Sequence, residues 1–165
     1  MIANRDIPNY IYMDNLNRLK ARLKGRVVLL GMGNTLKSDD GLGTILAKRL
    51  EGKSKMHVFS GGVMPENYLE KIVRLKPDTI LIVDAADFGG QAGEWKLLKP
   101  EEIHTLNFFS THNMSPALMI DYLQKSTSAD IMFLAIQPKD IGFGERLSAE
   151  IEKRIGELER FFTEL

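Results

Sequence analysis

The chain has 165 residues, of which 44% are hydrophobic and 27% are charged, with a formal net charge of +0. These values are typical of one soluble domain with a substantial core, and they predict no general attraction to nucleic acid or acidic membranes. The absence of cysteine excludes disulfides, thiolate metal sites and a cysteine nucleophile, and it fits a cytoplasmic protein. No apolar stretch approaches the roughly 20 residues that span a bilayer.

Residues 1–24 are interpreted as a polar extension ahead of a single domain over residues 25–165. Leucines recur at three- and four-residue spacing within residues 15–23, so we expect a short amphipathic helix there. Its packing partner could be the domain or another protein. The extension lacks the apolar segment of a signal peptide.

Apolar runs and helical patterns then alternate along the chain. Strands are expected over residues 27–30, 56–59, 79–83, 93–98 and 131–136. Helices are expected over residues 40–50, 66–75, 116–124 and 147–162, the first with Leu42, Ile45, Leu46 and Leu50 facing inward. This alternation predicts an α/β fold: a three-layer αβα sandwich with a mostly parallel, twisted sheet of about five strands and helices on both faces.

The segment over residues 31–43 combines a glycine-rich turn with two adjacent carboxylates, Asp39 and Asp40, where the turn becomes a helix. A phosphate-binding turn would present amides at this place, not carboxylates. The segment therefore favours metal or proton chemistry. A helix cap is an alternative role for Asp39, because aspartate is a preferred capping residue.

Other polar or glycine positions follow the remaining strands of the predicted sheet. They are Gly61 and Gly62 after the second strand, Asp84 at the end of the third, and Gln137 after the last apolar run. Sites in open α/β sheets form outside the carboxyl ends of the strands, so these positions are expected to converge. Capping of a turn is the alternative for Asp84, whose burial would otherwise call for a partner.

His112 lies in a loop that leads into a helix, whereas His57 and His104 are expected to be structural or exposed. Together with Asp40 and Asp84, His112 would form a set of hard to borderline ligands that binds metal weakly. Such a set suits a metal that arrives with a substrate. The sequence lacks His-Glu-x-x-His, Gly-x-Ser-x-Gly and the lysine of a P-loop, so a zinc protease, a serine hydrolase and a P-loop nucleotide site are unsupported.

Taken in order, these segments resemble the nickel–iron hydrogenase maturation endopeptidases, especially the branch that processes large subunits of hydrogen-evolving, membrane-associated hydrogenases. The matching pieces lie at residues 31–34, 39–43, 61–62, 65–67, 81–87, 93–94, 111–114 and 135–138. The chain departs from the family pattern at Ser60, where an aspartate often precedes the paired glycines, and in its extension before residue 25.

The resemblance implies a twisted five-stranded sheet and removal of the C-terminal extension from a nickel-loaded large-subunit precursor of a nickel–iron hydrogenase. It implies that Asp40, Asp84 and His112 contact nickel presented by the precursor, with no organic cofactor. Asp40 or Asp39 would be the general base, in the manner of an aspartic protease, unless the metal itself activates the water. The expected substrate contacts are Gly61, Gly62, Asn113 and Gln137, and the protein is expected to be a monomer.

Two other functions use the same residues or the same fold. A non-cleaving nickel-checkpoint chaperone would recognise the loaded precursor with the same three ligands. A flavodoxin-like module would bind a nucleotide or phosphate, although Asp39 and Asp40 oppose it. Shortening of the precursor separates the first alternative from a protease, and a nucleotide-binding screen tests the second.

Overall fold

The computed structural model describes residues 9–109 and 113–165. Its sheet has the strand order β2-β1-β3-β6-β4, and a two-residue strand, β5, pairs with β3. The strands are β1 (Val27–Met32), β2 (His57–Gly62), β3 (Thr79–Asp87), β4 (Trp95–Leu98), β5 (Asn107–Phe108) and β6 (Asp130–Ile136). β1 pairs in parallel with β2 and β3, and β3 with β6, whereas β4 is antiparallel to β6.

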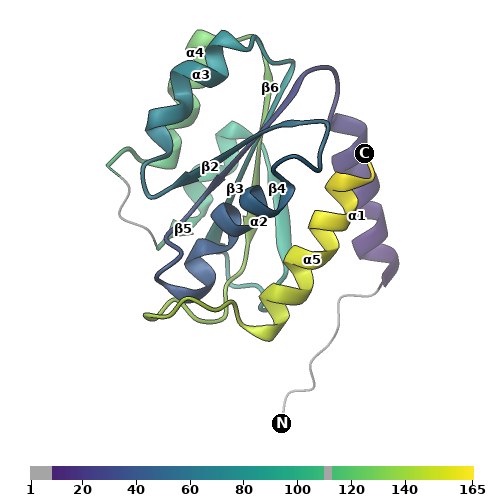
Figure 1. The fold of residues 1–165 in the computed structure, drawn as a ribbon, viewed down its shortest axis with the longest axis vertical. Coiled ribbons are helices and arrows are strands. Elements are labelled where there is room, and N and C mark those ends of the chain that lie inside the picture. Colours follow the sequence, from purple (N-terminus) through teal and green to yellow (C-terminus); the bar gives the residue numbers. More distant parts are fainter. Residues whose placement is uncertain (1–8, 110–112) are drawn as a thin grey trace.

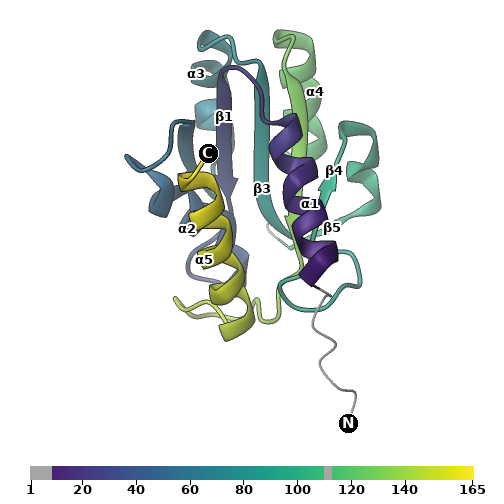
Figure 2. The ribbon, with the colours of Figure 1, turned by 90° about the vertical axis from the view of Figure 1, so that its right-hand side faces the viewer.

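Helices cover both faces of this sheet. They are α1 (Asn9–Arg22), α2 (Leu42–Leu50), α3 (Leu69–Arg74), α4 (Pro116–Ser126) and α5 (Ala149–Thr163). Figure 1 shows α1 and α5 on the right of the sheet and α3 and α4 on its left, and Figure 2 shows α1 and α5 in front of β1 and β3. The predicted three-layer sandwich with a mostly parallel sheet is confirmed.

Two hydrophobic clusters fill the spaces between the layers. One joins α1, α2 and α5 to one face of the sheet, with Leu19, Leu46 and Phe162 fully buried. The other joins α3 and α4 to the opposite face. Alternate residues of β1 belong to alternate clusters, as the two-residue period of a strand requires, and this explains why the whole strand is apolar.

The N-terminal helix is an integral part of the first cluster. α1 begins at Asn9, earlier than the predicted start at residue 15, and its Leu16 and Leu19 are buried against the domain. The Tyr12 ring meets the Trp95 ring edge to face, with 6.3 Å between centroids. At the helix end, Arg22 forms two hydrogen bonds with Asp130. Of the two packing partners left open by the sequence, the structure shows the domain.

Two predicted helices begin later than expected because each starts with a turn of 3₁₀ helix. Residues 38–41 and 65–68 form these turns, and α2 and α3 follow them. The expectation that Ile45 faces inward was wrong, since its side chain is only half-buried. The six-residue segment over residues 100–105 is a further 3₁₀ helix that the sequence pattern did not indicate.

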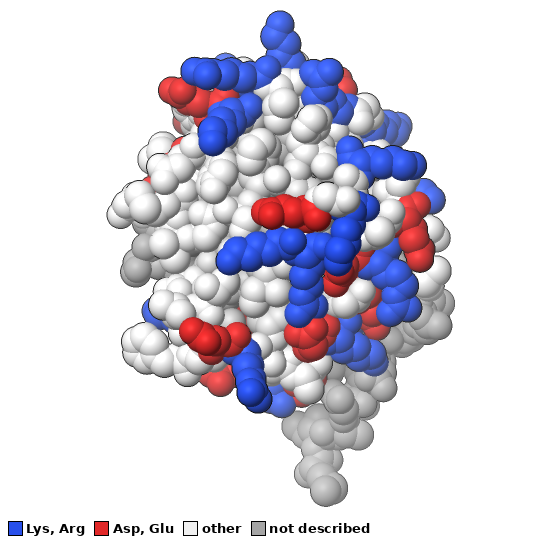
Figure 3. Space-filling model, viewed as in Figure 1, with Lys and Arg blue, Asp and Glu red and all other residues white. Residues whose placement is uncertain are grey.

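Charged side chains of both signs share the surface of α2 and α5. Arg49 bonds to Glu152 at 2.7 Å and Lys53 to Glu159 at 3.2 Å, and Figure 3 shows the mixture of signs over these helices. The left of the same view, over the end of β2, is formed mostly by uncharged residues. Across the described ranges, no helix is both long and apolar enough to cross a membrane.

Candidate active site

The glycine-rich turn after β1 brings the backbone of the following helix against the ends of the strands. Gly33 has φ of +126°, and a Cβ at this position would lie 1.9 Å from the Asp40 carbonyl oxygen. A Cβ at Gly43 would lie 2.2 Å from the carbonyl oxygen of Val83 in β3. Only glycine permits such close approach. The turn therefore packs directly on the carboxyl ends of β1 and β3.

Asp40 lies in the 3₁₀ turn over residues 38–41, and its side chain is 1% exposed. Its Oδ2 accepts a hydrogen bond from the backbone N–H of Asn34 at 3.1 Å. Because Asn34 belongs to the same turn, this bond fixes the carboxylate relative to the end of β1. The site thus contains a buried carboxylate with a defined orientation.

Asp84 lies on β3, the strand beside β1, and is also 1% exposed. Its Oδ1 accepts a hydrogen bond from the backbone N–H of Ala85 at 2.8 Å. β3 continues to Asp87, so the expectation that the strand ends at Asp84 was wrong. The residue still belongs to the carboxyl half of β3, and the 3₁₀ turn that holds Asp40 contacts this strand.

Asp39 connects the turn after β1 to the loop after β6. Its Oδ2 accepts hydrogen bonds from the backbone N–H groups of Lys139 and Asp140, both at 2.9 Å, and from the Ser148 hydroxyl. Its Oδ1 accepts a bond from the Ser148 N–H at 2.7 Å. The cap role was wrong for α2, whose cap is Gly41. Asp39 instead holds the loop that leads into α5.

The paired glycines Gly61 and Gly62 lie beside this turn; they are the last two residues of β2, so the expectation that they follow the strand was wrong. The carbonyl oxygen of Gly62 accepts a hydrogen bond from the Gly33 N–H at 2.9 Å. Gly61 is buried, and a Cβ there would lie 3.0 Å from Pro65. Gly62 has φ of +58°, and a Cβ there would meet no atom within 4 Å. Gly62 therefore borders open space at the carboxyl edge.

Gln137 is buried directly after β6 and holds a neighbouring loop. Its Oε1 accepts hydrogen bonds from the N–H groups of Phe88 and Gly90 at 3.0 and 3.1 Å. Its Nε2 donates to Asp87 at 3.2 Å. Both ends of the amide are thus engaged within the protein, so any contact of Gln137 with a substrate stays a prediction.

The predicted metal ligand His112 lies outside the described residues, as do Ser110 and Thr111. The next residue, Asn113, is exposed, and so are His57 and His104. Among the residues that the structure describes, no group of three or more His, Cys, Asp or Glu could hold a metal ion. A metal site that includes Asp40 and Asp84 would therefore need a further ligand from outside the described residues or from another molecule.

Exposed apolar side chains surround the site on the loops after β1, β2 and β6. This apolar rim consists of Leu36, Val63, Met64, Ile141 and Phe143. Phe143 is 93% exposed, and its loop is fixed because the Gly144 N–H donates to the Leu36 carbonyl at 3.0 Å. Figure 1 shows the loops after β1 and β6 together at the lower end of the sheet. Exposed apolar residues on adjoining loops are typical of an interaction surface.

The rim and the partners of Asp39 were missed by the sequence analysis. The signal for the rim was an aromatic residue between two glycines, Gly142 and Gly144, in a polar loop. Ser148 looks like an ordinary helix cap, and nothing local indicates that it bonds to Asp39. On the other side of this loop, Lys139 donates a hydrogen bond to Glu150, which lowers the pKa of that carboxyl.

Buried carboxylates at the carboxyl edge of a parallel sheet, inside a rim that suits another protein, are the features expected of a hydrolase with a protein substrate. The family described as hydrogenase maturation protease (HycI) matches residues 42–164. The hydrogenase 3 maturation protease of Escherichia coli is 40% identical over 118 residues, which cover 70% of this chain and 75% of that protein.

Solved structures agree with this match. The crystal structure of a NiFe hydrogenase maturation protease, HycI, from Thermococcus kodakarensis has a TM-score of 0.79 and 32% identity, covering 89% of this chain and 97% of that one. The solution structure of the endopeptidase HycI from Escherichia coli has a TM-score of 0.75 and 33% identity, covering 85% and 90%. The chain therefore belongs to the HycI family of hydrogenase maturation proteases. This assignment decides against the nucleotide-binding alternative.

Proposed function

We propose that this hydrogenase maturation protease removes the C-terminal extension of a nickel–iron hydrogenase large-subunit precursor by one peptide-bond cleavage. The observation that supports it most directly is the pair of carboxylates, Asp40 and Asp84, each 1% exposed at the carboxyl edge of adjacent strands. Two buried carboxylates at one edge can orient a metal, a water molecule or both.

Nickel enters this proposal as part of the substrate. Asp40 and Asp84, with His112 added, would contact nickel that the precursor already holds. Two carboxylates and one imidazole bind a borderline metal less tightly than a set rich in histidine or thiolate. Recognition would then depend on ligands from both proteins, and an unloaded precursor would lack the contact that places its scissile bond.

Asp40 is the better candidate for the general base. The carboxylate of Asp39 accepts four hydrogen bonds from the loop over residues 139–148, so both of its oxygens are already engaged in holding that loop. Asp40 would take a proton from water as the water attacks the scissile carbonyl carbon, and the C–N bond then breaks as the amine leaves with a proton. Activation of the water by nickel is the other mechanism, and it needs the same position of Asp40.

The surroundings of the site support a folded protein as the substrate. The apolar rim offers exposed side chains on the three loops around Asp40, and association with another protein would remove them from water. Gly62 borders open space, so a substrate backbone could approach it without meeting a side chain. Asn113 is exposed and available for a hydrogen bond with the substrate. In this proposal Gln137 shapes the site through the loop over residues 87–90.

We place the reaction in the cytoplasm. There the protease would act as a monomer on a folded precursor. No organic cofactor is required, because hydrolysis needs only the carboxylates, water and the metal of the substrate.

The test is to mix the purified protein with a large-subunit precursor, prepared with and without nickel, and to follow the mass of the precursor. Loss of a C-terminal peptide only from the nickel-loaded form is the expected result. Cleavage that does not depend on nickel would contradict the role of the metal. A nickel-dependent complex without any loss of mass would identify a checkpoint chaperone instead.

The same assay tests the site residues. Asp40→Ala, Asp84→Ala and His112→Ala are each expected to slow cleavage by about 100-fold or more, since general bases and charge-placing groups contribute at least this much. Asp121→Ala, which removes an exposed carboxylate on α4, is the control and should cleave at the normal rate. Normal rates for all three site variants would show that the assignment is wrong.

A further inference from the structure

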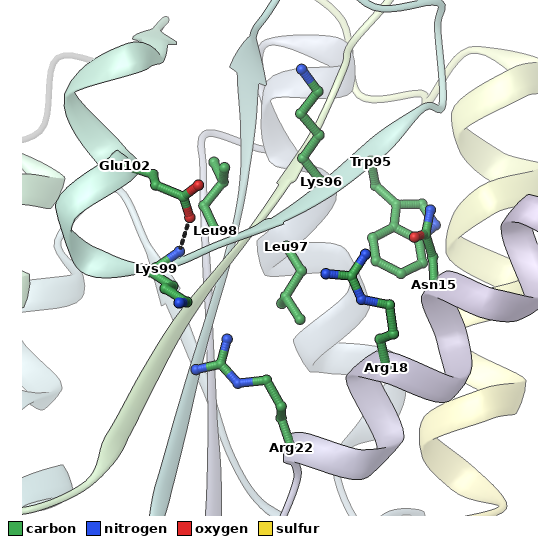
Figure 4. A pocket seen from close by; sticks show the side chains of 9 residues that line it. All are labelled: Asn15, Arg18, Arg22, Trp95, Lys96, Leu97, Leu98, Lys99 and Glu102. Carbon is green, nitrogen blue, oxygen red and sulfur yellow. Dashed lines mark hydrogen bonds between the residues drawn. The ribbon is translucent and has the colours of Figure 1, made fainter.

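The outer edge of the sheet carries a groove that the proposed cleavage site does not use. A hollow of about 440 Å³ lies between α1 and β4. Its walls are Asn15, Arg18 and Arg22 on α1, the consecutive residues 95–99, and Glu102. Figure 4 shows Arg18 and Arg22 pointing from α1 toward β4. We call this hollow the β4 groove.

The lining of the β4 groove shows that it follows the free side of a strand. Successive side chains of a strand point to opposite faces: Trp95 and Leu97 pack with the α1 layer, whereas Leu98 packs with the α4 layer. All of residues 95–99 nevertheless line the hollow, so it meets residues of both faces, as a groove along the strand's outer edge does. Within residues 9–109 and 113–165, β4 pairs with β6 alone, so its other edge can accept a further strand.

Positive charge dominates the groove. Its walls include four cationic side chains, those of Arg18, Arg22, Lys96 and Lys99, and one acidic side chain, that of Glu102. Glu102 is already engaged, because it accepts a hydrogen bond from the Lys99 N–H at 2.7 Å, the dashed line in Figure 4.

Two of the four cations have local partners. Arg22 bonds to Asp130, and the Lys96 ammonium lies 4.7 Å from the centre of the Phe88 ring. Arg18 and Lys99 have exposed side chains, and in the described part of the chain neither enters an ion pair. The groove therefore combines unpaired backbone groups with cations placed on both sides of the strand.

We propose that the β4 groove binds an acidic polypeptide segment in extended conformation, which adds to the sheet as a strand next to β4. Backbone hydrogen bonds from β4 would provide affinity, and the cations would select carboxylates on the added strand. Arg18 reaches the groove from the α1 side and Lys99 from the end of β4.

Nucleic acid, which also carries negative charge, is a less suitable ligand for the β4 groove than an acidic peptide. Single-stranded nucleic acids bind through stacking of bases on exposed aromatic rings, and the one aromatic side chain of the groove, Trp95, is 5% exposed. A hollow of about 280 Å³ shares Arg22 and Lys99 with the groove and continues past the end of β4. The two hollows therefore adjoin beyond the end of β4.

Binding can be followed in the purified full chain without any precursor, because Trp95 is the single tryptophan of the sequence. The probe is a capped octapeptide of alternating glutamate and threonine, and the control peptide has glutamine in place of glutamate. We expect a saturable change in Trp95 fluorescence with the acidic peptide and binding about ten-fold weaker with the neutral one, the effect of a few exposed ion pairs. Absence of binding by the acidic peptide would overturn the proposal.

Variants locate the site. The double variant Arg18→Gln/Lys99→Gln should bind the acidic peptide about ten-fold more weakly than the unmodified chain does. The double variant Lys48→Gln/Lys153→Gln, which removes the same charge from exposed positions on α2 and α5, should bind as the unmodified chain does. Equal losses in both double variants would show a general charge effect and overturn the proposal.

Methylated peptides test the added strand. N-methylation at odd positions and at even positions blocks opposite edges of a peptide strand. One of the two methylated peptides should therefore lose binding while the other keeps it. Equal binding by both, or equally tight binding of oligothymidylate, would show that the groove is a general anion surface and not a strand-addition site.

Discussion

The carboxyl edge of the sheet and its outer edge along β4 both gather charged side chains, but in opposite environments. Asp39, Asp40 and Asp84 at the carboxyl edge are at most 1% exposed, whereas Arg18 and Lys99 beside β4 are exposed. Buried charges need fixed partners and therefore have fixed positions, while exposed cations keep their water and their freedom. We infer that the first arrangement suits chemistry and the second suits recognition.

The largest effect on stability is expected at the carboxyl edge, from removal of a buried carboxylate that has no proposed part in the reaction. Asp39→Ala leaves four hydrogen-bond donors without their acceptor: the backbone N–H groups of Lys139, Asp140 and Ser148, and the Ser148 hydroxyl. We expect the free energy of unfolding to fall by about 3 kcal/mol, measured by urea denaturation. Asp121→Ala on the exposed surface is the control, and an equal loss in both variants would contradict the role of Asp39 in holding the loop.

A smaller effect is expected from Phe143, the residue of the apolar rim on the loop that Asp39 holds. Phe143→Ser should leave the melting temperature unchanged, because the ring is 93% exposed. It should raise KM for the nickel-loaded precursor about five-fold at unchanged kcat, since only uniform substrate binding is lost. The matched control is Ile11→Ser, an exposed apolar residue on α1. If Phe143→Ser and Ile11→Ser have the same KM, the rim does not contact the substrate.

The smallest effect is expected where the charges are exposed. Arg22→Gln removes the ion pair with Asp130, whose side chains are 30% and 48% exposed. We expect a loss of about 0.5 kcal/mol in the free energy of unfolding, with a smaller loss at high salt. Urea denaturation at two salt concentrations measures both values. A loss as large as that of Asp39→Ala would remove the distinction between the two edges.

The layers of the fold were predictable because they depend on local patterns. The apolar runs at β1, β3 and β6 and the apolar stripe of α5 are visible in short windows of sequence. β5 was not predictable, since two residues carry no periodicity, and its pairing with β3 depends on the tertiary structure. The early start of α1 was missed because its apolar residues Ile11 and Met13 are exposed and do not continue the buried face that Leu16 and Leu19 form.

The site was predictable only in part for the same reason. Asp40 and Asp84 stand out because each interrupts or follows an apolar strand, and topology brings the carboxyl ends of strands together. The role of Asp39 depends on Ser148, which is 109 residues away in the chain. No local pattern contains such information. The amide of Gln137 likewise looks available in the sequence, and only the fold shows that it holds the 87–90 loop.

The docking of α1 also has a consequence for synthesis of the chain. Arg22 and its partner Asp130 are separated by 108 residues, and Trp95, which meets Tyr12, also comes late. A ribosome needs roughly 5–20 s to add the intervening residues. During that time Arg22 lacks its native ion-pair partner, and the Tyr12 ring lacks its contact until Trp95 has been added. The native packing of α1 is therefore complete only after β6 has been made.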